Sequence, residues 1–380
     1  MNKVTIVGTD LHDRNMLLRL AAGTGDSHEK SFKNDAEGRG NMVDYLIQFA
    51  MKHKSDRIVF VYEASGQGYG LCDLLSDHGI ECFVLSPSHL PKSAKGKKNK
   101  TDSKDALKLF ELARAHVLAN NELPIVWTPP KKLRHDRELI RTRLESAEAC
   151  TRVKLQITSL LKRSGVALPD WFCKNRNWTR KFVKWLKDQA QRMDVIAPVI
   201  LTFVERFEIL NKQITDLDRH VRTLSRTDRY KAGVAALCEL PGVGLITAMT
   251  FLTEMGDLTR FSNRRQVAAY LGLCPSSFES GGPDVDRKGH ITRQGPGRVR
   301  KVLCQAAWTA IRKDEATRNT FLKIQNKRSD RRKKAVVAIM RKLAIVMWHR
   351  ALGAGVSVEL TAPPAKPPCW TQQPSVGQAG

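Results

Sequence analysis

The stretch Lys3-Val4-Thr5-Ile6-Val7-Gly8-Thr9-Asp10 decides the fold of the first part of the chain. It is an apolar, β-branched run that ends on an acid, so it predicts a buried strand with a carboxylate at its end. Weaker alternation over residues 16–20 and 31–33, with Gly and Asp turns between the runs, predicts two further strands. We therefore expect a meander of three strands.

Strands and helices alternate after this meander. Residues 42–51 and 69–75 have helical spacing, residues 58–62 form a second buried strand that leads into Glu63, and residues 81–85 form another strand. A meander followed by alternating strands and helices is typical of a mixed sheet covered by helices. The fold class that we expect is α/β at the N-terminus followed by an α region.

Four carboxylates stand where separate elements end or begin. Asp10 closes the first strand and Glu63 ends the second buried strand, while Asp102 and Asp105 lie at i and i+3 at the start of a helix over residues 103–116. A nuclease that holds two divalent metals roughly 4 Å apart needs carboxylates from distant segments to converge. An all-oxygen site of this kind favours Mg²⁺. Any helix start also favours acids, and this alternative explains either aspartate of the helix but not Asp10 and Glu63.

The charge balance indicates a polyanionic partner. Sixty-four Lys and Arg stand against 38 Asp and Glu, which gives a formal net charge of +26. A ribosome-associated or membrane-surface protein is an alternative, but the carboxylate pattern fits neither. Three places carry candidate nucleic-acid contacts, and for each the alternative is a solvated surface or an ordinary turn. They are the basic loop with Lys97, Lys98 and Lys100, the glycine hairpin with Gly242 and Gly244, and the cluster Arg331, Arg332, Lys333 and Lys334.

A long heptad pattern occupies the middle of the chain. After a charged helix over residues 131–161, apolar side chains recur at spacings of three and four, which are Ile196, Ile200, Phe203, Phe207, Leu210, Ile214, Leu217, Val221 and Leu224. This seam supports either a coiled coil between chains or a helical hairpin within one chain. A second globular part runs over about residues 237–352, and the proline-rich residues 361–380 are expected to be disordered.

The remaining composition bounds the cellular setting. The chain has no run of about 18 apolar residues and no signal-like start, so we expect a cytosolic protein with no membrane partner. The eight cysteines show no C-x-x-C pair, and we interpret them as reduced thiols without structural zinc. Ser280 is followed by two glycines, which on the residues alone is a weak signal for anything but a turn.

Taken together, these motifs resemble the insertion-sequence transposases of family 110, the DEDD transposases guided by a bridge RNA. The resemblance covers about residues 1–350. Its elements are Gly8-Thr9-Asp10, Glu63-Ala64-Ser65-Gly66, the segment 100–106 with Asp102 and Asp105, the hairpin 240–248, the segment 268–275 and Glu279-Ser280-Gly281.

The resemblance implies a division of the chain into four parts. It implies a RuvC-like ribonuclease-H domain over residues 1–120 and a helical coiled-coil connector over 121–235. A mainly helical transposase domain over 236–355 and a disordered tail over 356–380 follow.

The resemblance also implies a chemistry and a set of partners. Asp10, Glu63, Asp102 and Asp105 would hold Mg²⁺, and Ser280 would be the nucleophile that forms a phosphoserine link to DNA. The serine and the carboxylates of one site would come from different subunits of a dimer or tetramer. Donor DNA, target DNA and a noncoding bridge RNA would be the partners, in the bacterial cytosol or nucleoid.

Two other functions remain open from the sequence. A Mg²⁺-dependent junction-resolving nuclease would use the same carboxylates to activate water and would not need Ser280. A non-catalytic nucleic-acid-binding protein would keep the acids for structural reasons only.

Overall fold

The computed structural model describes residues 3–91, 101–172, 177–193, 196–277 and 288–356. The chain forms two compact units, which divide between Thr128 and Pro129. The expected boundary at residues 120 and 121 lies close to this division. The further boundary at residues 235 and 236 stays a prediction.

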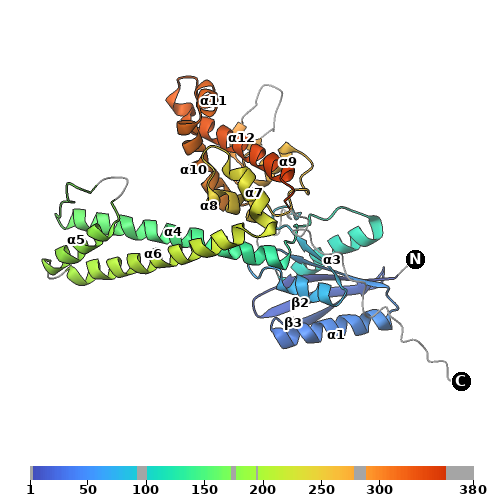
Figure 1. Ribbon diagram of the computed structural model, residues 1–380. Coiled ribbons are helices and arrows are strands. Elements are labelled where there is room, and N and C mark those ends of the chain that lie inside the picture. Colours follow the sequence, from blue (N-terminus) through green and yellow to red (C-terminus); the bar gives the residue numbers. More distant parts are fainter. Residues whose placement is uncertain (1–2, 92–100, 173–176, 194–195, 278–287, 357–380) are drawn as a thin grey trace. The chain divides into compact units, whose positions relative to one another are not determined.

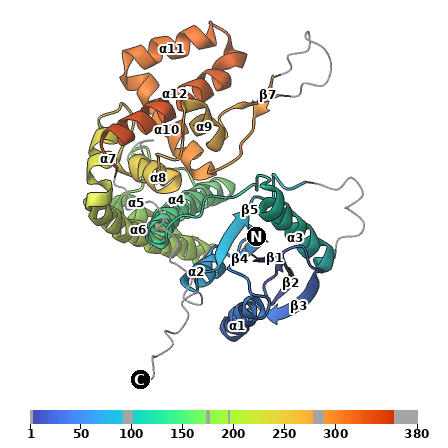
Figure 2. The same cartoon turned by 90° about the vertical axis from the view of Figure 1, so that its right-hand side faces the viewer.

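The first unit is a mixed sheet with helices (Figures 1 and 2). Its elements are β1 (Val4–Leu11), β2 (Asn15–Ala22), β3 (His28–Lys33), α1 (Ala36–Lys52), β4 (Arg57–Glu63), α2 (Gly70–Asp77), β5 (Glu81–Leu85) and α3 (Asp102–Ala119). The strand order is β3-β2-β1-β4-β5. Strand β2 is antiparallel to both β1 and β3, β4 is parallel to β1, and β5 is parallel to β4. The predicted meander and mixed sheet are confirmed.

The two faces of the sheet pack against different helices. On one face Val7 and Phe60 join an apolar cluster with Leu46 of α1 and Leu75 of α2. On the other face Ile6, Val59 and Val61 pack with Leu109 and Phe110 of α3. Side chains of a strand alternate between faces, so every second residue of β1 from Ile6 onward faces α3.

Helix α1 begins earlier than the predicted residue 42. Asp35 takes an extended conformation, and its side-chain oxygen accepts a hydrogen bond from the backbone N–H of Gly38 at 2.7 Å. This cap starts the helix at Ala36, before the apolar periodicity becomes visible in the sequence.

The second unit is mainly helical. Its elements are α4 (Lys131–Arg163), α5 (Arg180–Gln191), α6 (Ala197–Ser225), α7 (Asp228–Cys238), α8 (Leu245–Met255), α9 (Arg264–Tyr270), β6 (Pro275–Ser277), β7 (Lys288–Ile291), α10 (Gly297–Lys313), α11 (Glu315–Gln325), a 3-10 turn η1 (Ser329–Arg331) and α12 (Arg332–Gly353). The helical C-terminal region that we expected is confirmed.

Helices α4 and α6 form a long antiparallel hairpin with α5 at its far end (Figure 1). Near the far end, Ile157 of α4 and Ile200 of α6 belong to one apolar cluster with Phe182 of α5. Toward the other end, Arg143 of α4 forms an ion pair with Asp218 of α6 at 2.8 Å. The heptad seam is therefore used within one chain, and a coiled coil between chains stays a prediction.

The base of this hairpin shares a core with the helices that follow. Ile140 of α4 and Val221 of α6 belong to the apolar cluster that also contains buried residues of α7, α8, α10 and α12. Arg137 of α4 is buried and donates hydrogen bonds to the backbone oxygens of Thr253 (2.6 Å) and Glu254 (2.9 Å) at the end of α8. The hairpin and the C-terminal helices are thus continuous in packing.

Within the described ranges, no helix combines the length and the apolar character that crossing a membrane requires. Six cysteines fall in these ranges, and each is a free thiol.

Candidate metal centre

A glycine brings α3 against the middle of the sheet. Gly8 of β1 lies on the face that packs against α3, and a Cβ placed there would overlap the backbone nitrogen of Phe110 and lie 2.7 Å from the carbonyl carbon of Leu109. Only a residue without a side chain permits this approach of helix and strand backbones. The contact places α3 beside the strand that carries Asp10.

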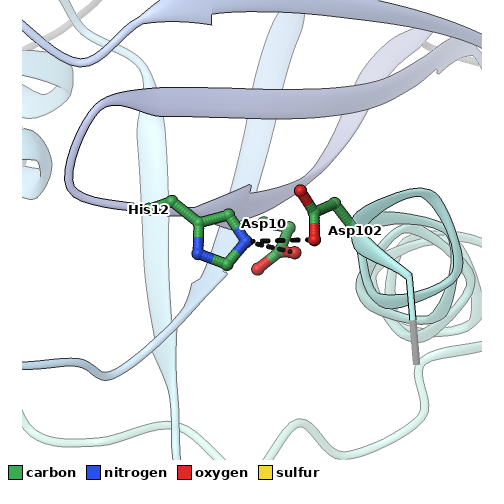
Figure 3. Close-up of side chains that lie close together, drawn as sticks. All are labelled: Asp10, His12 and Asp102. Atoms are coloured by element: carbon green, nitrogen blue, oxygen red, sulfur yellow. Dashed lines mark hydrogen bonds and ion pairs between the residues drawn. The ribbon is translucent and has the colours of Figure 1, made fainter.

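Asp10 and Asp102 meet at this junction (Figure 3). Asp10 is two residues beyond Gly8, so its side chain faces α3, and it is only 18% exposed. Asp102 is the first residue of α3, after Thr101 in extended conformation, and Asp105 follows in the same turn. The predicted convergence of Asp10 and Asp102 from distant segments is present in the structure.

His12 completes a compact group, although it is not among the site residues predicted from the sequence. Its Nε2 atom lies 3.1 Å from Oδ2 of Asp10 and 3.3 Å from Oδ1 of Asp102. One ligand atom from each of these three residues lies within 4.8 Å of the other two. The spacing Asp10-Leu11-His12 was the available signal, because residues at i and i+2 of an extended segment face the same side.

Glu63 ends β4 beside Asp10. The parallel register pairs Thr9 with Tyr62, so Asp10 and Glu63 are the next residues on adjacent strands. Glu63 has the same parity as Val59 and Val61 and therefore belongs to the α3 face of the sheet. The group of three ligand atoms nevertheless contains neither Glu63 nor Asp105.

The electrostatics of Asp10 fit a cation site. Burial raises the pKa of the Asp10 carboxyl, His12 opposes this shift, and the negative charges of Asp105 and Asp102 raise the pKa further. A divalent cation bound between neighbouring carboxylates offsets their mutual repulsion and stabilises their ionised forms. Asp10, His12 and Asp102 are the described residues whose ligand atoms lie close enough together to hold such a cation.

A hydrogen-bond network connects the two loops that flank these acids. The Nδ2 atom of Asn34 donates to the backbone oxygen of His12 and to Oε1 of Gln67, both at 2.6 Å. Nε of Arg39 donates to Oδ1 of Asn34 at 2.7 Å, and Nε2 of Gln67 donates to Asp13 at 3.2 Å. Asn34 thus ties the turn after Asp10 to the loop after Glu63.

The glycine hairpin between α7 and α8 has the form that the sequence predicts. Gly242 has a φ of +83°, and a Cβ there would lie 2.9 Å from the backbone nitrogen of Ala310 in α10. Gly244 is the N-cap residue of α8, so no side chain caps this helix start. A Cβ at Gly244 would meet nothing within 4 Å. A hollow beside this helix start is lined by Asp218, Arg222, Gly244, Leu245, Ile246 and Thr247.

The other candidate contacts fall in different parts of the chain. Arg331 ends η1, and Arg332, Lys333 and Lys334 begin α12 with exposed side chains. The guanidinium of Arg332 lies 5.0 Å from the ring centre of Trp308. Lys97, Lys98, Lys100 and Ser280 lie outside the described residues.

Close backbone contacts hold together the segment before β6 and the segment after β7. Gly272 and Gly295 both have φ values near the left-handed region, +63° and +70°, and a Cβ on Gly272 would lie 2.6 Å from the nitrogen of Gln294. Nη1 of Arg300 donates to the backbone oxygens of Leu271 (3.1 Å), Gln294 (2.7 Å) and Gly295 (3.3 Å). This crossing of two loops fixes the ends of β6 and β7.

Comparison with known proteins gives two family matches. Residues 7–165 match the DEDD model of insertion sequence IS110, described as "Transposase". Residues 234–322 match a model described as "Transposase IS116/IS110/IS902 family". The first match contains all four predicted carboxylates, and the second contains the glycine hairpin and Ser280.

Curated relatives are similar over most of the chain. A putative transposase, y4qE, of Sinorhizobium fredii is 32% identical over 283 residues, which are 72% of this chain and 64% of that protein. A second putative transposase of that organism, y4rJ, is 26% identical over 365 residues, 90% of each chain. The transposase for insertion sequence element IS1533 of Leptospira borgpetersenii is 23% identical over 308 residues, 81% of this chain and 86% of that protein.

Proposed function

This chain belongs to the IS116/IS110/IS902 family of transposases, and from this premise we propose that it cuts and rejoins DNA with a DEDD metal site and a serine nucleophile. The observation that carries the proposal is the meeting of Asp10 and Asp102 on the α3 face of the sheet. The strand order of a three-stranded meander followed by two parallel strands supports a RuvC-like ribonuclease-H fold for this unit.

Asp10, Glu63, Asp102 and Asp105 are the residues that would hold Mg²⁺. When bound there, the metal would polarise a phosphate group and favour the ionised form of an attacking hydroxyl. Gly8 allows α3, which carries Asp102 and Asp105, to pack closely against β1. Asn34 connects the turn after β1, which follows Asp10, to the loop after β4, which follows Glu63. Side chains carried by strands and helices are held more precisely than side chains on loops, which supports a preorganised site.

Ser280 is the proposed nucleophile. Its hydroxyl oxygen would form a bond to phosphorus, one phosphorus–oxygen bond of the DNA strand would break, and the serine proton would end on the leaving oxygen. The phosphodiester count is unchanged, so the reverse attack by a DNA hydroxyl rejoins a strand without an energy source. The proposal for Ser280 rests on its position in the family motif Glu279-Ser280-Gly281.

The partners follow from the same premise. DNA is the substrate of the family, and the exposed cluster of Arg332, Lys333 and Lys334 together with the α8 start at Gly244 supports contact with phosphate groups. We further propose that a noncoding bridge RNA guides the reaction, that the active form is a dimer or tetramer, and that it acts in the bacterial cytosol or nucleoid.

Trapping of a covalent protein–DNA adduct tests the proposal. Purified protein with the cognate element ends, the noncoding RNA and Mg²⁺ is denatured in detergent, and the amount of labelled DNA that migrates with the protein is measured. We expect an adduct with the wild type and none with Ser280→Ala, Asp10→Asn or Asp102→Asn. Ser276→Ala is the matched control, because the Ser276 hydroxyl donates to the backbone oxygen of His290 at 2.8 Å.

Other outcomes separate the alternatives. Strand cleavage that persists in Ser280→Ala but is lost in Asp10→Asn would indicate a nuclease that uses water. DNA that stays intact under all conditions, although the protein binds it, would favour a non-catalytic binding protein.

A further inference from the structure

Helix α5 at the far end of the hairpin has two chemically opposite faces. Phe182, Leu186 and Ala190 recur every four residues and are buried against α4 and α6. Four of the six exposed positions of the helix carry cations, which are Arg180, Lys181, Lys184 and Lys187. The other two are Asp188 and Gln191, and Arg192 follows at the cap.

Within the part of the chain that the structure describes, most of this positive charge is not paired with a carboxylate. Lys187 is paired with Glu208 of α6, at 3.0 Å and 3.2 Å from its two carboxylate oxygens. Arg180 and Lys184 have no carboxylate partner among the residues that the structure describes. Lys181 lies 4.4 Å from the ring centre of Trp171, a contact that orients its ammonium group without cancelling its charge.

Further cations lie on the same end of the hairpin. Arg152, Lys162 and Arg163 of α4 are exposed there, and Nζ of Lys154 lies 5.7 Å from the ring centre of Trp178. A surface of this kind concentrates polyanions, since unpaired cations on a rigid helix attract regularly spaced phosphates.

Among the described aromatic side chains of this region, Trp171 is 38% exposed, with the ammonium group of Lys181 over its ring, and the others are less exposed. Phe182 is fully buried, Trp185 stacks on it with ring centres 5.4 Å apart, and Trp178 contacts its edge at 5.0 Å. Proteins that bind single strands place exposed aromatic rings under the bases. The single exposed ring of Trp171 is already covered by the Lys181 ammonium group, so the α5 region suits the phosphate backbone of a duplex better than the bases of an unpaired strand.

We propose that the exposed face of α5, formed by Arg180, Lys181 and Lys184, binds the phosphate backbone of duplex DNA without reading its sequence. This inference rests on the proposed function, which makes DNA the substrate, and adds a binding surface remote in sequence from the carboxylates and from Ser280. Contacts of this kind position a duplex and carry no base specificity.

The salt dependence of binding tests the surface. The affinity of the full chain for a duplex DNA of arbitrary sequence is measured by fluorescence anisotropy across a series of KCl concentrations. Each phosphate contact adds about 0.9 to the slope of log affinity against log salt for B-form DNA. In Arg180→Gln/Lys181→Gln/Lys184→Gln we expect a slope smaller by roughly 2 to 3, since up to three contacts are lost.

A control variant removes the same charge from paired cations. In Arg57→Gln/Arg219→Gln/Arg350→Gln, each cation lies outside α5 and already has a carboxylate partner, which is Glu81, Asp216 and Glu239 in turn. We expect this variant to keep the wild-type slope. Circular dichroism and adduct formation at low salt report whether both variants are folded.

Three results would overturn the inference. An unchanged slope in the α5 variant, with wild-type DNA binding intact, contradicts the α5 surface but leaves the proposed function standing. A weakened affinity for duplex RNA with unchanged affinity for duplex DNA assigns the face to a different partner. Absence of salt-dependent binding in the wild type contradicts both the surface and the proposed function.

Discussion

Gly8 is the residue on which the geometry of the candidate metal centre depends most directly. Gly8→Ala places a methyl group against the backbone of Phe110, and α3 must move away from β1. Overpacking of this kind costs about 1–3 kcal/mol of unfolding free energy. We expect urea unfolding to show this loss, and a Mn²⁺ titration to show weaker binding, because Asp102 and Asp105 move with α3.

Gly40 provides the matched control for this change. It lies inside α1, where an added Cβ meets nothing within 4 Å. Gly40→Ala should stabilise the protein by about 0.5–1 kcal/mol and leave Mn²⁺ binding unchanged. Equal effects of the two substitutions would show that the contact between Gly8 and α3 does not position the acids.

At this scale the sequence predicts the charged ligands better than the residues that support them. Asp10 and Glu63 end apolar strands, and a carboxylate at such a place is visible in the sequence. His12 and Asn34 are ordinary turn residues in the sequence. Their roles arise only when the β1–β2 turn, the end of β3 and the loop after β4 come together.

At the scale of elements, the ion pair between α4 and α8 determines how the hairpin is held. Nε and Nη2 of Arg141 donate to the two carboxylate oxygens of Glu254 at 2.7 Å and 3.0 Å, and the Glu254 side chain is 6% exposed. Glu254→Gln leaves a half-buried guanidinium without this partner. We expect a loss of about 3 kcal/mol in unfolding free energy, at the low end for a broken buried pair, because Arg141 retains some exposure.

Glu138 offers a comparison on the same arginine. Its side chain is 68% exposed and lies 3.1 Å from Nη1 of Arg141. Glu138→Gln should cost less than about 1 kcal/mol, the usual range for an exposed pair. If chemical denaturation gave the two variants equal losses, burial would not be what makes the α4–α8 pair important.

The long helices could be predicted from the sequence, but the partner against which each apolar seam packs could not. The heptad pattern from Ile196 to Leu224 predicts α6 and its apolar seam, and it is compatible with partners in the same chain or in another. In the structure, Ile200 and Phe207 of α6 pack with α4 and α5 of the same chain. Helix α5 itself is short and follows a loop, so its alternation of apolar and basic faces is easily missed in sequence.

At the scale of the whole molecule, the division into two units has a thermodynamic consequence. A ligand stabilises only the cooperative unit that binds it. We expect calorimetry of the DNA-free protein to show two unfolding transitions, of which only the one assigned to residues 1–128 moves to higher temperature in Mg²⁺. Asp10→Asn should abolish this shift. A single transition, or an equal shift of both, would contradict an independent metal-binding unit.

The sequence predicts the architecture of the first unit better than that of the second unit. Strands at residues 3–10 and 58–62 predict the central pair of the sheet, because buried β-branched runs have few other uses. The packing of α4 and α6 into the core of α7 to α12 depends on buried polar contacts such as Arg137 with Thr253. An arginine on a charged helix gives no sign in the sequence that it is buried.

The buried contacts at the beginning of α4 fix the distance between the C-terminal helices and α5. Arg137 fixes α4 to α8, and Leu161 lies in the apolar cluster with α5. These two residues are 24 positions apart on the helix, which at 1.5 Å per residue is about 36 Å. A straight duplex in contact with both parts would be covered over roughly 11 base pairs at 3.4 Å per step. The length of one helix would then set the size of the DNA footprint.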